Sequence, residues 1–240
     1  MKLIFISDLH LAHDTPEKNQ LFYALLKNWR GKVDALYILG DFFDYWLGDD
    51  DDNQFIREIK SALCEFSQIT PIYFRGGNHD FAVGKRFAQE TRITLIPDMT
   101  TLYTGKHKLL LSHGDTFCTL DIGYQKMKRV FQNPIVMFIL RRIPIRLRYK
   151  IKEHMEQGSQ KSNYIPKPDY VYNVVDETMV NYAKQYGADT IIHGHTHHPG
   201  CYTIANSHVV RYETPDWEDN PAGALLFYDD GEFSFLTQDN

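Results

Sequence analysis

Leu3-Ile4-Phe5-Ile6-Ser7-Asp8-Leu9-His10 is a short apolar run that ends in polar side chains, and it decides the fold. An uninterrupted apolar run of this length is typical of a strand buried on both faces. Two further runs of this kind follow at 35–39 and 71–74, and segments with helical spacing lie between them, at 21–29 and 55–66. Repeated strand–helix–strand order predicts parallel pairing, with helices on the faces of the sheet.

From Thr94 onward the chain predicts mainly strands joined by turns, with one long helix at 170–186. The predicted strands are Thr101–Tyr103, Lys108–Ser112, Thr190–His193, Gly200–Ile204, His208–Tyr212, Ala224–Tyr228 and Phe233–Leu236. Turn residues such as Asn206-Ser207 separate several of them, as in hairpins. A parallel α/β layer followed by mostly antiparallel strands predicts two stacked sheets with helices outside.

The segment from about 121 to 167 interrupts this alternation, because its patterns are helical. It carries the densest basic charge in the chain, interleaved with apolar residues: Arg141, Arg142, Arg146, Arg148, Lys150 and Lys152. An ordinary amphipathic helical pair with solvated charges would explain this composition. The same mixture also suits helices that lie on an anionic membrane surface, although Pro134 and Pro144 interrupt it. We favour the second interpretation.

The bulk composition limits the class of protein. The chain has 240 residues without a composition break, which favours a single domain over 1–240 that carries the helical insertion. A formal net charge of −5 argues against a nucleic-acid binder. The three cysteines are widely spaced, which indicates a reducing compartment. The apolar run before Asp8 is too short for a signal peptide, and no stretch approaches the roughly 18 apolar residues that span a bilayer. We therefore expect a cytoplasmic protein that is soluble or bound to a membrane surface.

Five polar clusters stand out, four of them directly after predicted buried strands. They are Asp8-Leu9-His10, Gly40-Asp41-Phe42-Phe43-Asp44, Gly77-Asn78-His79-Asp80, Ser112-His113-Gly114-Asp115 and Gly194-His195-Thr196-His197. Ligands of open α/β sheets bind beyond the carboxyl ends of the strands. We therefore expect all five clusters to converge on one rim.

The side chains of these clusters are suited to a divalent cation. Carboxylate, amide and imidazole groups together suit Mn²⁺, Fe²⁺ or Zn²⁺. Asp8 and His10 lie two residues apart, so both can face the same side of an extended strand end, as can His195 and His197. Asp41 could bridge two ions. Each cluster alone is compatible with an ordinary turn, because Gly, Asn and Asp tolerate left-handed conformations. All five in this order favour a metal site.

This ordered set resembles the five motifs of the calcineurin-like metallophosphoesterase superfamily, and the resemblance spans Asp8 to His197. It implies an α/β fold, a double-sheet αββα sandwich. One divalent metal would be held by Asp8, His10, Asp41 and His197. A second metal would be held by Asp41, Asn78, His113 and His195.

The same resemblance implies a hydrolytic mechanism. Two adjacent metal ions clamp phosphate oxygens and lower the pKa of a bridging water towards about 7. His79 and Asp80 would be catalytic, with His79 donating a hydrogen bond or proton to the substrate and Asp80 orienting its ring. The alternative for His79 is that it merely completes a turn.

Longer runs around the motifs narrow the resemblance to one family. Residues 40–50, 84–88, 113–125 and 216–217 look like those of the UDP-2,3-diacylglucosamine diphosphatases of lipid A biosynthesis. That family cleaves its substrate at the α-phosphorus to UMP and 2,3-diacylglucosamine 1-phosphate, usually with Mn²⁺, and uses a helical insertion as a lid. The resemblance implies that eight residues contact the substrate: Asn78, His79, Asp121, Tyr124, Ser159, Asn163, Lys167 and His195.

The chain departs from this family in two places. His79 stands where the family typically has arginine, and residues 165–168 are proline-rich, so the match at Lys167 needs a short insertion. A metallophosphoesterase acting on a soluble phosphodiester or nucleotide diphosphate is therefore an alternative, which His79 favours. A non-catalytic scaffold is a further alternative, which the complete ligand set opposes. The lipid substrate and the basic insertion predict a peripheral protein on the inner face of the bacterial inner membrane.

Overall fold

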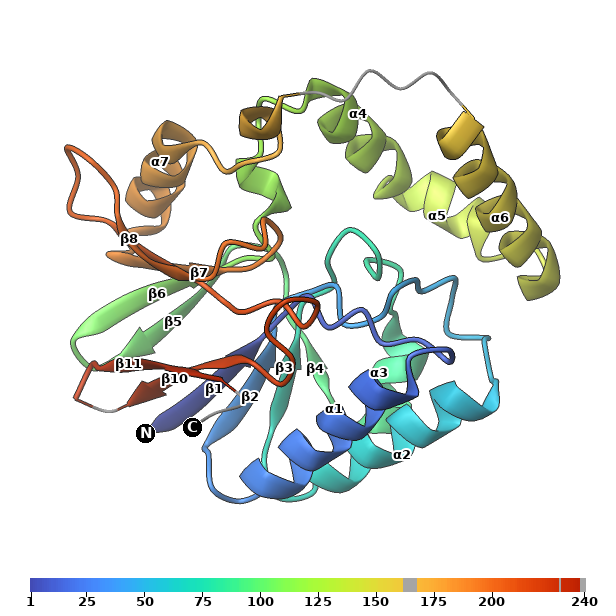
Figure 1. The fold of residues 1–240 in the computed structure, drawn as a ribbon, viewed down its shortest axis with the longest axis horizontal. Coiled ribbons are helices and arrows are strands. Elements are labelled where there is room, and N and C mark those ends of the chain that lie inside the picture. The colour runs from blue at the N-terminus through green and yellow to red at the C-terminus, as the bar shows by residue number, and fades with distance from the viewer. Residues whose placement is uncertain (162–167, 229, 238–240) are drawn as a thin grey trace.

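The computed structural model describes residues 1–161, 168–228 and 230–237, and it contains two stacked sheets between layers of helices (Figure 1). The first sheet has the order β11-β10-β1-β2-β3-β4 and the second β5-β6-β7-β9-β8. The first comprises β1 (Lys2–Ile6), β2 (Ala35–Ile38), β3 (Ile72–Phe74), β4 (Thr94–Leu95), β10 (Ala224–Tyr228) and β11 (Phe233–Leu236). The second comprises β5 (Thr100–Thr104), β6 (His107–Leu111), β7 (Thr190–His193), β8 (Gly200–Thr203) and β9 (Val210–Glu213).

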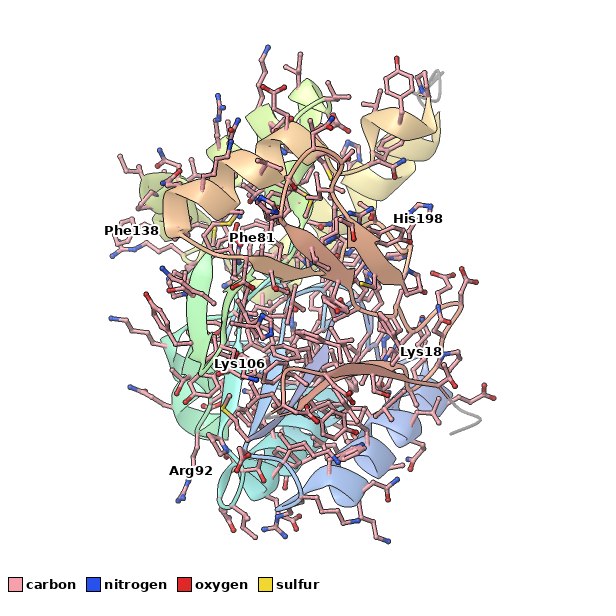
Figure 2. All side chains as sticks on the ribbon, turned by 90° about the vertical axis from the view of Figure 1, so that its left-hand side faces the viewer. Lys18, Phe81, Arg92, Lys106, Phe138 and His198 are labelled. Atoms are coloured by element: carbon pink, nitrogen blue, oxygen red, sulfur yellow. The ribbon has the colours of Figure 1, made fainter. Side chains whose placement is uncertain are left out.

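Helices cover both outer faces, so the predicted αββα sandwich is confirmed. Under the first sheet lie α1 (Pro16–Trp29), α2 (Gln54–Ser67) and α3 (Lys85–Thr91), and over the second lies α7 (Asp176–Tyr186). Strands β1 to β4 pair in parallel, as their order along the chain predicts. Alternate side chains of β1 divide between the two sides of the sheet. Ile4 and Ile6 belong to the core with α1 and α2, whereas Leu3 and Phe5 pack against the second sheet. Figure 2 shows side chains filling the space between the sheets.

Several boundaries and pairings differ from those predicted. The helix expected at 170–186 begins at Asp176, where Asp176 and Glu177 lie in its first turn and suit the positive end of the helix dipole. The strand expected at 208–212 begins at Val210, because the carbonyl of Val209 closes a turn with the amide of Ile204. Hairpin β10–β11 joins the first sheet through antiparallel pairing with β1. The second sheet is mixed, because β7 pairs in parallel with both β6 and β9.

The predicted helical insertion consists, in its described part, of α4 (Ile122–Phe131), α5 (Pro134–Leu140) and α6 (Ile145–Lys161). These helices stand beside the sandwich, on the side to which the motif loops project (Figure 1). The two prolines separate them: Pro134 opens α5, capped by Asn133, and Pro144 directly precedes α6. Met137 packs against the core under the first sheet, whereas Phe138 and Ile139 are exposed. We call α4–α6 the lid helices. The division of the chain into one domain with an insertion stays a prediction.

Candidate metal centre

The five polar clusters meet at one edge of the sandwich. Their loops follow β1, β2, β3, β6 and β7, and three groups of side chains bring their ligand atoms within 4.8 Å of one another. The groups are Asp8–His10–His197, His10–Asp41–His79 and Asp41–His113–His195. The convergence expected from strand order is therefore observed.

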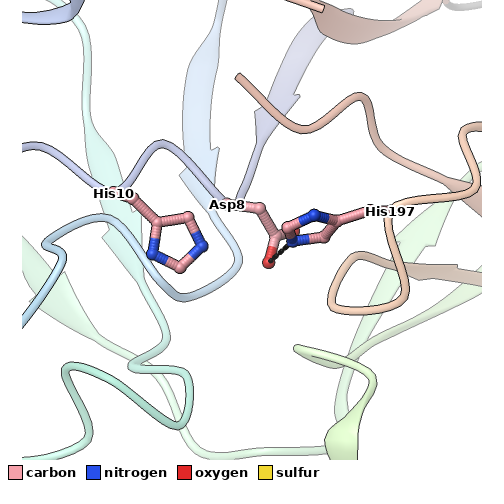
Figure 3. Close-up of side chains that lie close together, drawn as sticks. All are labelled: Asp8, His10 and His197. Carbon is pink, nitrogen blue, oxygen red and sulfur yellow. Dashed lines mark ion pairs between the residues drawn. The ribbon is translucent and has the colours of Figure 1, made fainter. Parts of the chain in front are cut away.

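The first group surrounds the carboxylate of Asp8, which is buried. Oδ1 of Asp8 lies 3.7 Å from Nε2 of His197, with the ring of His10 on the other side (Figure 3). Oδ2 accepts hydrogen bonds from the backbone N–H of His195, at 3.0 Å, and from the hydroxyl of Ser7. Within the described part of the chain, buried Oδ1 has no hydrogen-bond partner. Because a buried carboxylate oxygen requires compensation, this atom fits a cation between Asp8, His10 and His197.

The second group is built around His113, which is fully buried. Its Nδ1 lies 2.9 Å from the carbonyl oxygen of Leu39, so Nδ1 carries the proton. Nε2 faces Oδ1 of Asn78 at 2.9 Å and Oδ2 of Asp41 at 3.5 Å. Although burial lowers it, the carboxylates of Asp41 and Asp8 raise the pKa of His113 above its ordinary value, so a proton on Nε2 can supply the positive charge between these oxygens that a metal ion would replace. A carbonyl behind a histidine ligand is also the usual means of fixing its tautomer.

Asp41 lies between the two groups. Its Oδ2 is 4.0 Å from Nε2 of His10 and 3.5 Å from Nε2 of His113. One carboxylate oxygen therefore faces the side chains of both predicted metals. This arrangement supports the bridging role that the sequence suggested for Asp41.

Most of the predicted ligands have a left-handed backbone conformation. The φ angles are 54° for Asp8, 49° for His10, 50° for Asp41, 79° for His195 and 55° for His197. Positive φ is uncommon for residues other than glycine, and its clustering marks functional sites. Strand β1 ends at Ile6, so Asp8 and His10 come together in a left-handed loop. The expectation that an extended strand end orients these two side chains is therefore wrong.

Gly194 allows this loop to approach the first strand closely. A Cβ atom at this position would lie 2.1 Å from Oδ2 of Asp8, a distance that no side chain tolerates. The H-bond between the amide of His195 and the same oxygen depends on that approach. The lack of room for a side chain beside Asp8 therefore explains the glycine of the fifth motif.

Burial and hydrogen bonding set the charge of the histidines. Burial lowers the pKa of His10 and of His195 to about 4, so both are neutral and offer a lone pair to a cation. The carboxylate of Asp8, 3.7 Å from Nε2, raises the pKa of His197 to about 9. In the metal-free protein His197 is therefore an imidazolium that partly compensates Asp8, and a metal ion would replace its proton.

The geometry of Asp80 differs from the one expected. Its carboxylate is fully buried and accepts hydrogen bonds from the backbone N–H groups of Gly77, Asp41, Phe42 and Phe43, at 2.6 to 3.3 Å. Asp80 thus holds two motif loops together. The ring of His79 is oriented instead by the carbonyl oxygen of Asp44, 2.5 Å from Nδ1. The expectation that Asp80 orients this ring is wrong, because the amides of the neighbouring loop use its oxygens.

The predicted substrate contacts on the lid side are described only in part. Asp121 caps α4, accepting from the N–H of Tyr124 at 2.9 Å, and the ring of Tyr124 lies 6.1 Å from that of His195. Ser159 falls within α6, and Asn163 and Lys167 lie outside the described residues. The roles of these residues stay predictions.

Sequence reasoning missed two buried acids beside the centre. Asp115 binds Nζ of Lys128 at 2.8 Å and accepts a hydrogen bond from the hydroxyl of Tyr124. Glu213 accepts hydrogen bonds from the hydroxyl of Thr196 and the N–H of His198, and so braces the fifth motif loop. Asp115 belongs to the fourth motif, and this position is a signal that it lies near the centre. No sequence signal marks Glu213.

The extended second motif has a structural explanation. Asp49 accepts hydrogen bonds from the N–H groups of Gly84, Arg86 and Phe87, which form the first turn of α3. The runs at 40–50 and 84–88 are therefore joined through a helix cap. Asp50 faces the lid instead, where it pairs with Arg148.

The prediction that the basic residues of the insertion form an exposed surface is wrong for Arg148. Its side chain is 6% exposed, and its guanidinium binds both oxygens of Asp50 at 2.7 Å and the carbonyl oxygen of Leu47 at 2.6 Å. The hydroxyl of Tyr149 also donates to Asp51. Arg148 is thus an anchor between α6 and the second motif, because the loop surrounds its charge. Arg141, Arg142 and Arg146 are exposed, as expected.

The two-sheet fold and the paired ligand groups define a metal-dependent phosphoesterase. The chain belongs to the calcineurin-like phosphoesterase family, whose model matches residues 1–199. Three bacterial relatives are each named UDP-2,3-diacylglucosamine hydrolase. The protein of Pseudomonas fluorescens is 39% identical over 90% of this chain and 88% of its own length. The protein of Chromobacterium violaceum is 38% identical over 96% of this chain and 97% of its own length. The protein of Edwardsiella ictaluri is 41% identical over 84% of this chain and 78% of its own length.

Proposed function

We propose that this protein hydrolyses the diphosphate of UDP-2,3-diacylglucosamine, in lipid A biosynthesis, to UMP and 2,3-diacylglucosamine 1-phosphate by water attack at the α-phosphorus. The complete, converging ligand set around Asp41 carries this proposal. The substrate is supported by relatives of that name, which align with 84% to 96% of this chain. Two divalent cations, most simply Mn²⁺, would bind phosphate oxygens here and acidify a bridging water.

The protein's own groups prepare the site in two ways. The donor atoms are held by buried contacts, such as those of His113 with Leu39 and of Asp8 with His195, so little reorganisation is needed. His79 lies at the rim, with Nε2 4.0 Å from Oδ2 of Asp41. Its Nδ1 donates to the carbonyl of Asp44, and Nε2 is the ring atom that faces the centre. We infer that His79 contacts the diphosphate through Nε2, in the place of an arginine.

The lid helices provide the apolar surface that two acyl chains require. Ile122, Val130, Phe138, Ile139 and Leu147 are all exposed large apolar residues of these helices. None of the helices in the described part of the chain has the length and apolarity to cross a bilayer. We propose that the lid, with exposed Arg141, Arg142 and Arg146, docks on the anionic inner face of the bacterial inner membrane.

The substrate is tested by incubating the purified protein with Mn²⁺ and UDP-2,3-diacylglucosamine and following UMP by chromatography. Asp41→Asn, which removes the shared carboxylate, should abolish release and lower the bound metal. Asp219→Asn, at an exposed acid outside the centre, should change neither. If the wild-type protein releases no UMP but hydrolyses a soluble phosphodiester, the proposed substrate is wrong and the second activity is favoured.

Membrane docking is tested by sedimentation with vesicles that contain 30% anionic lipid. Replacing Arg141, Arg142 and Arg146 with serine should reduce binding about 100-fold, since each basic residue near the surface contributes about 1 kcal/mol and the three together about 3 kcal/mol. Replacing Lys27, Lys32 and Arg92 removes the same charge from the opposite end of the molecule and is the matched control. Equal binding by both triple variants would contradict the proposal.

A further inference from the structure

The lid also contacts the segment beside His79. Nζ of Lys152, on α6, lies 4.0 Å above the ring of Tyr45, and the centroid of that ring is 4.9 Å from the ring of His79. His79 in turn makes an edge contact with the metal-ligand candidate His10, at 4.8 Å. A continuous series of side chains therefore runs from the lid to the metal centre.

Two other contacts hold the ring of His79. Nδ1 donates to the carbonyl oxygen of Asp44, and the ring makes its edge contact with His10. Tyr45 supplies a third contact, from the residue directly after Asp44, and this contact limits the tilt of the ring about the Nδ1 hydrogen bond. Tyr45 is 41% exposed, so burial in the core does not explain its position.

We propose that Tyr45 is a positioning residue that holds His79 toward the substrate phosphate, and that Lys152 fixes Tyr45 when the lid is docked. The inference rests on the proposed function and deepens it. Arg148 and Tyr149 secure α6 against residues 47–51 of the same loop, so Lys152 is held over Tyr45. Lid position is thereby coupled to the orientation of His79.

Kinetics of UMP release test the positioning role. Tyr45→Ala should lower kcat about 3- to 10-fold, the value of one aromatic contact, while KM and bound metal change little. Tyr45→Phe keeps the ring and should retain the wild-type kcat. Lys152→Met should lower kcat in the same direction by a smaller factor.

The chain offers a matched control for these variants. Nζ of Lys108 lies 4.9 Å over the ring of Tyr103 at the turn end of hairpin β5–β6, the end opposite His113. Tyr103→Ala and Lys108→Met remove the same kind of pair there and should leave kcat unchanged. A wild-type kcat in Tyr45→Ala would overturn the inference.

A double-mutant cycle with His79→Gln separates positioning from general destabilisation. If Tyr45 acts through His79, Tyr45→Ala should cause no further loss in the His79→Gln background. Additive losses would refute the coupling. If the wild-type protein releases no UMP, the proposed substrate fails, and the same cycle is measured with bis(4-nitrophenyl) phosphate, a generic diester.

A second readout needs no turnover. NMR of the protein with ring-labelled histidines identifies the His79 signal by its loss in His79→Gln. Tyr45→Ala should shift that signal, because the nearby aromatic ring is removed, whereas Tyr45→Phe and Tyr103→Ala should not. An unmoved His79 signal in Tyr45→Ala would refute the contact itself.

Discussion

Arg148→Met should release the lid from the second motif while leaving the sandwich folded. The guanidinium links α6 to the loop through Asp50 and through the carbonyl of Leu47. Asp50 is 48% exposed, so that ion pair contributes about 0–1 kcal/mol. A hydrogen bond from a charged, buried donor to Leu47 contributes about 1.5–3 kcal/mol. Loss of about 3 kcal/mol of docking free energy would raise the undocked population about 100-fold.

Hydrogen exchange of the backbone amides of α6 measures this opening directly. We expect about 100-fold faster exchange in Arg148→Met, with little change in the urea midpoint, because Arg148 lies outside the core of the sandwich. Arg146→Met, an exposed position on the same helix, is the control. Unchanged exchange in α6 of Arg148→Met would show that the anchor does not hold the lid.

Three further predictions concern the site and its support. Gly194→Ala would place Cβ 2.1 Å from Oδ2 of Asp8, so we expect loss of bound metal by elemental analysis; full metal content would refute the close approach. Asp49→Ala removes the acceptor for three amides of α3 and should lower the free energy of unfolding in urea by about 1–2 kcal/mol, whereas an unchanged value would disprove the cap. In the metal-free protein, Asp8 raises the pKa of His197 from 6.5 to about 9, so this stabilisation is complete below pH 6.5 and is lost as the pH rises to about 9. Urea midpoints should fall over that range in the wild type and less in His197→Asn; equal slopes would contradict this.

The local sequence predicts those parts of the molecule that depend on short-range patterns. Continuous apolar runs identify the buried strands β1, β2 and β3, because a strand covered on both faces needs no polar side chains. The cap of α2 is also local, because the side chain of Asn53 accepts from the N–H of Ile56, three residues further on. Short α3 and two-residue β4 were missed, since neither contains a full period of apolar positions.

The metal centre was predicted from order and chemistry together. Parallel strands expose their carboxyl ends at one edge, so residues such as Asp8, Asp41 and His113 had to approach one another once the strand order was known. The sequence could not predict how Asp8 and His10 are oriented. Their left-handed backbone is set by bonds to Gly40 and Asp41, which come from another loop.

The sequence by itself determined the class of fold, the candidate ligands and the helical character of the insertion, because periodicity and residue chemistry are local properties. Only the tertiary structure decided which polar residues act on the site and which support it. Arg148 shares the sequence context of Arg146, yet it is buried against a loop 98 residues away at Asp50. Likewise, the ring of His79 contacts the carbonyl oxygen of Asp44, whereas Asp80 accepts from backbone amides. Hydrogen bonds between distant loops depend on how the strands and helices pack.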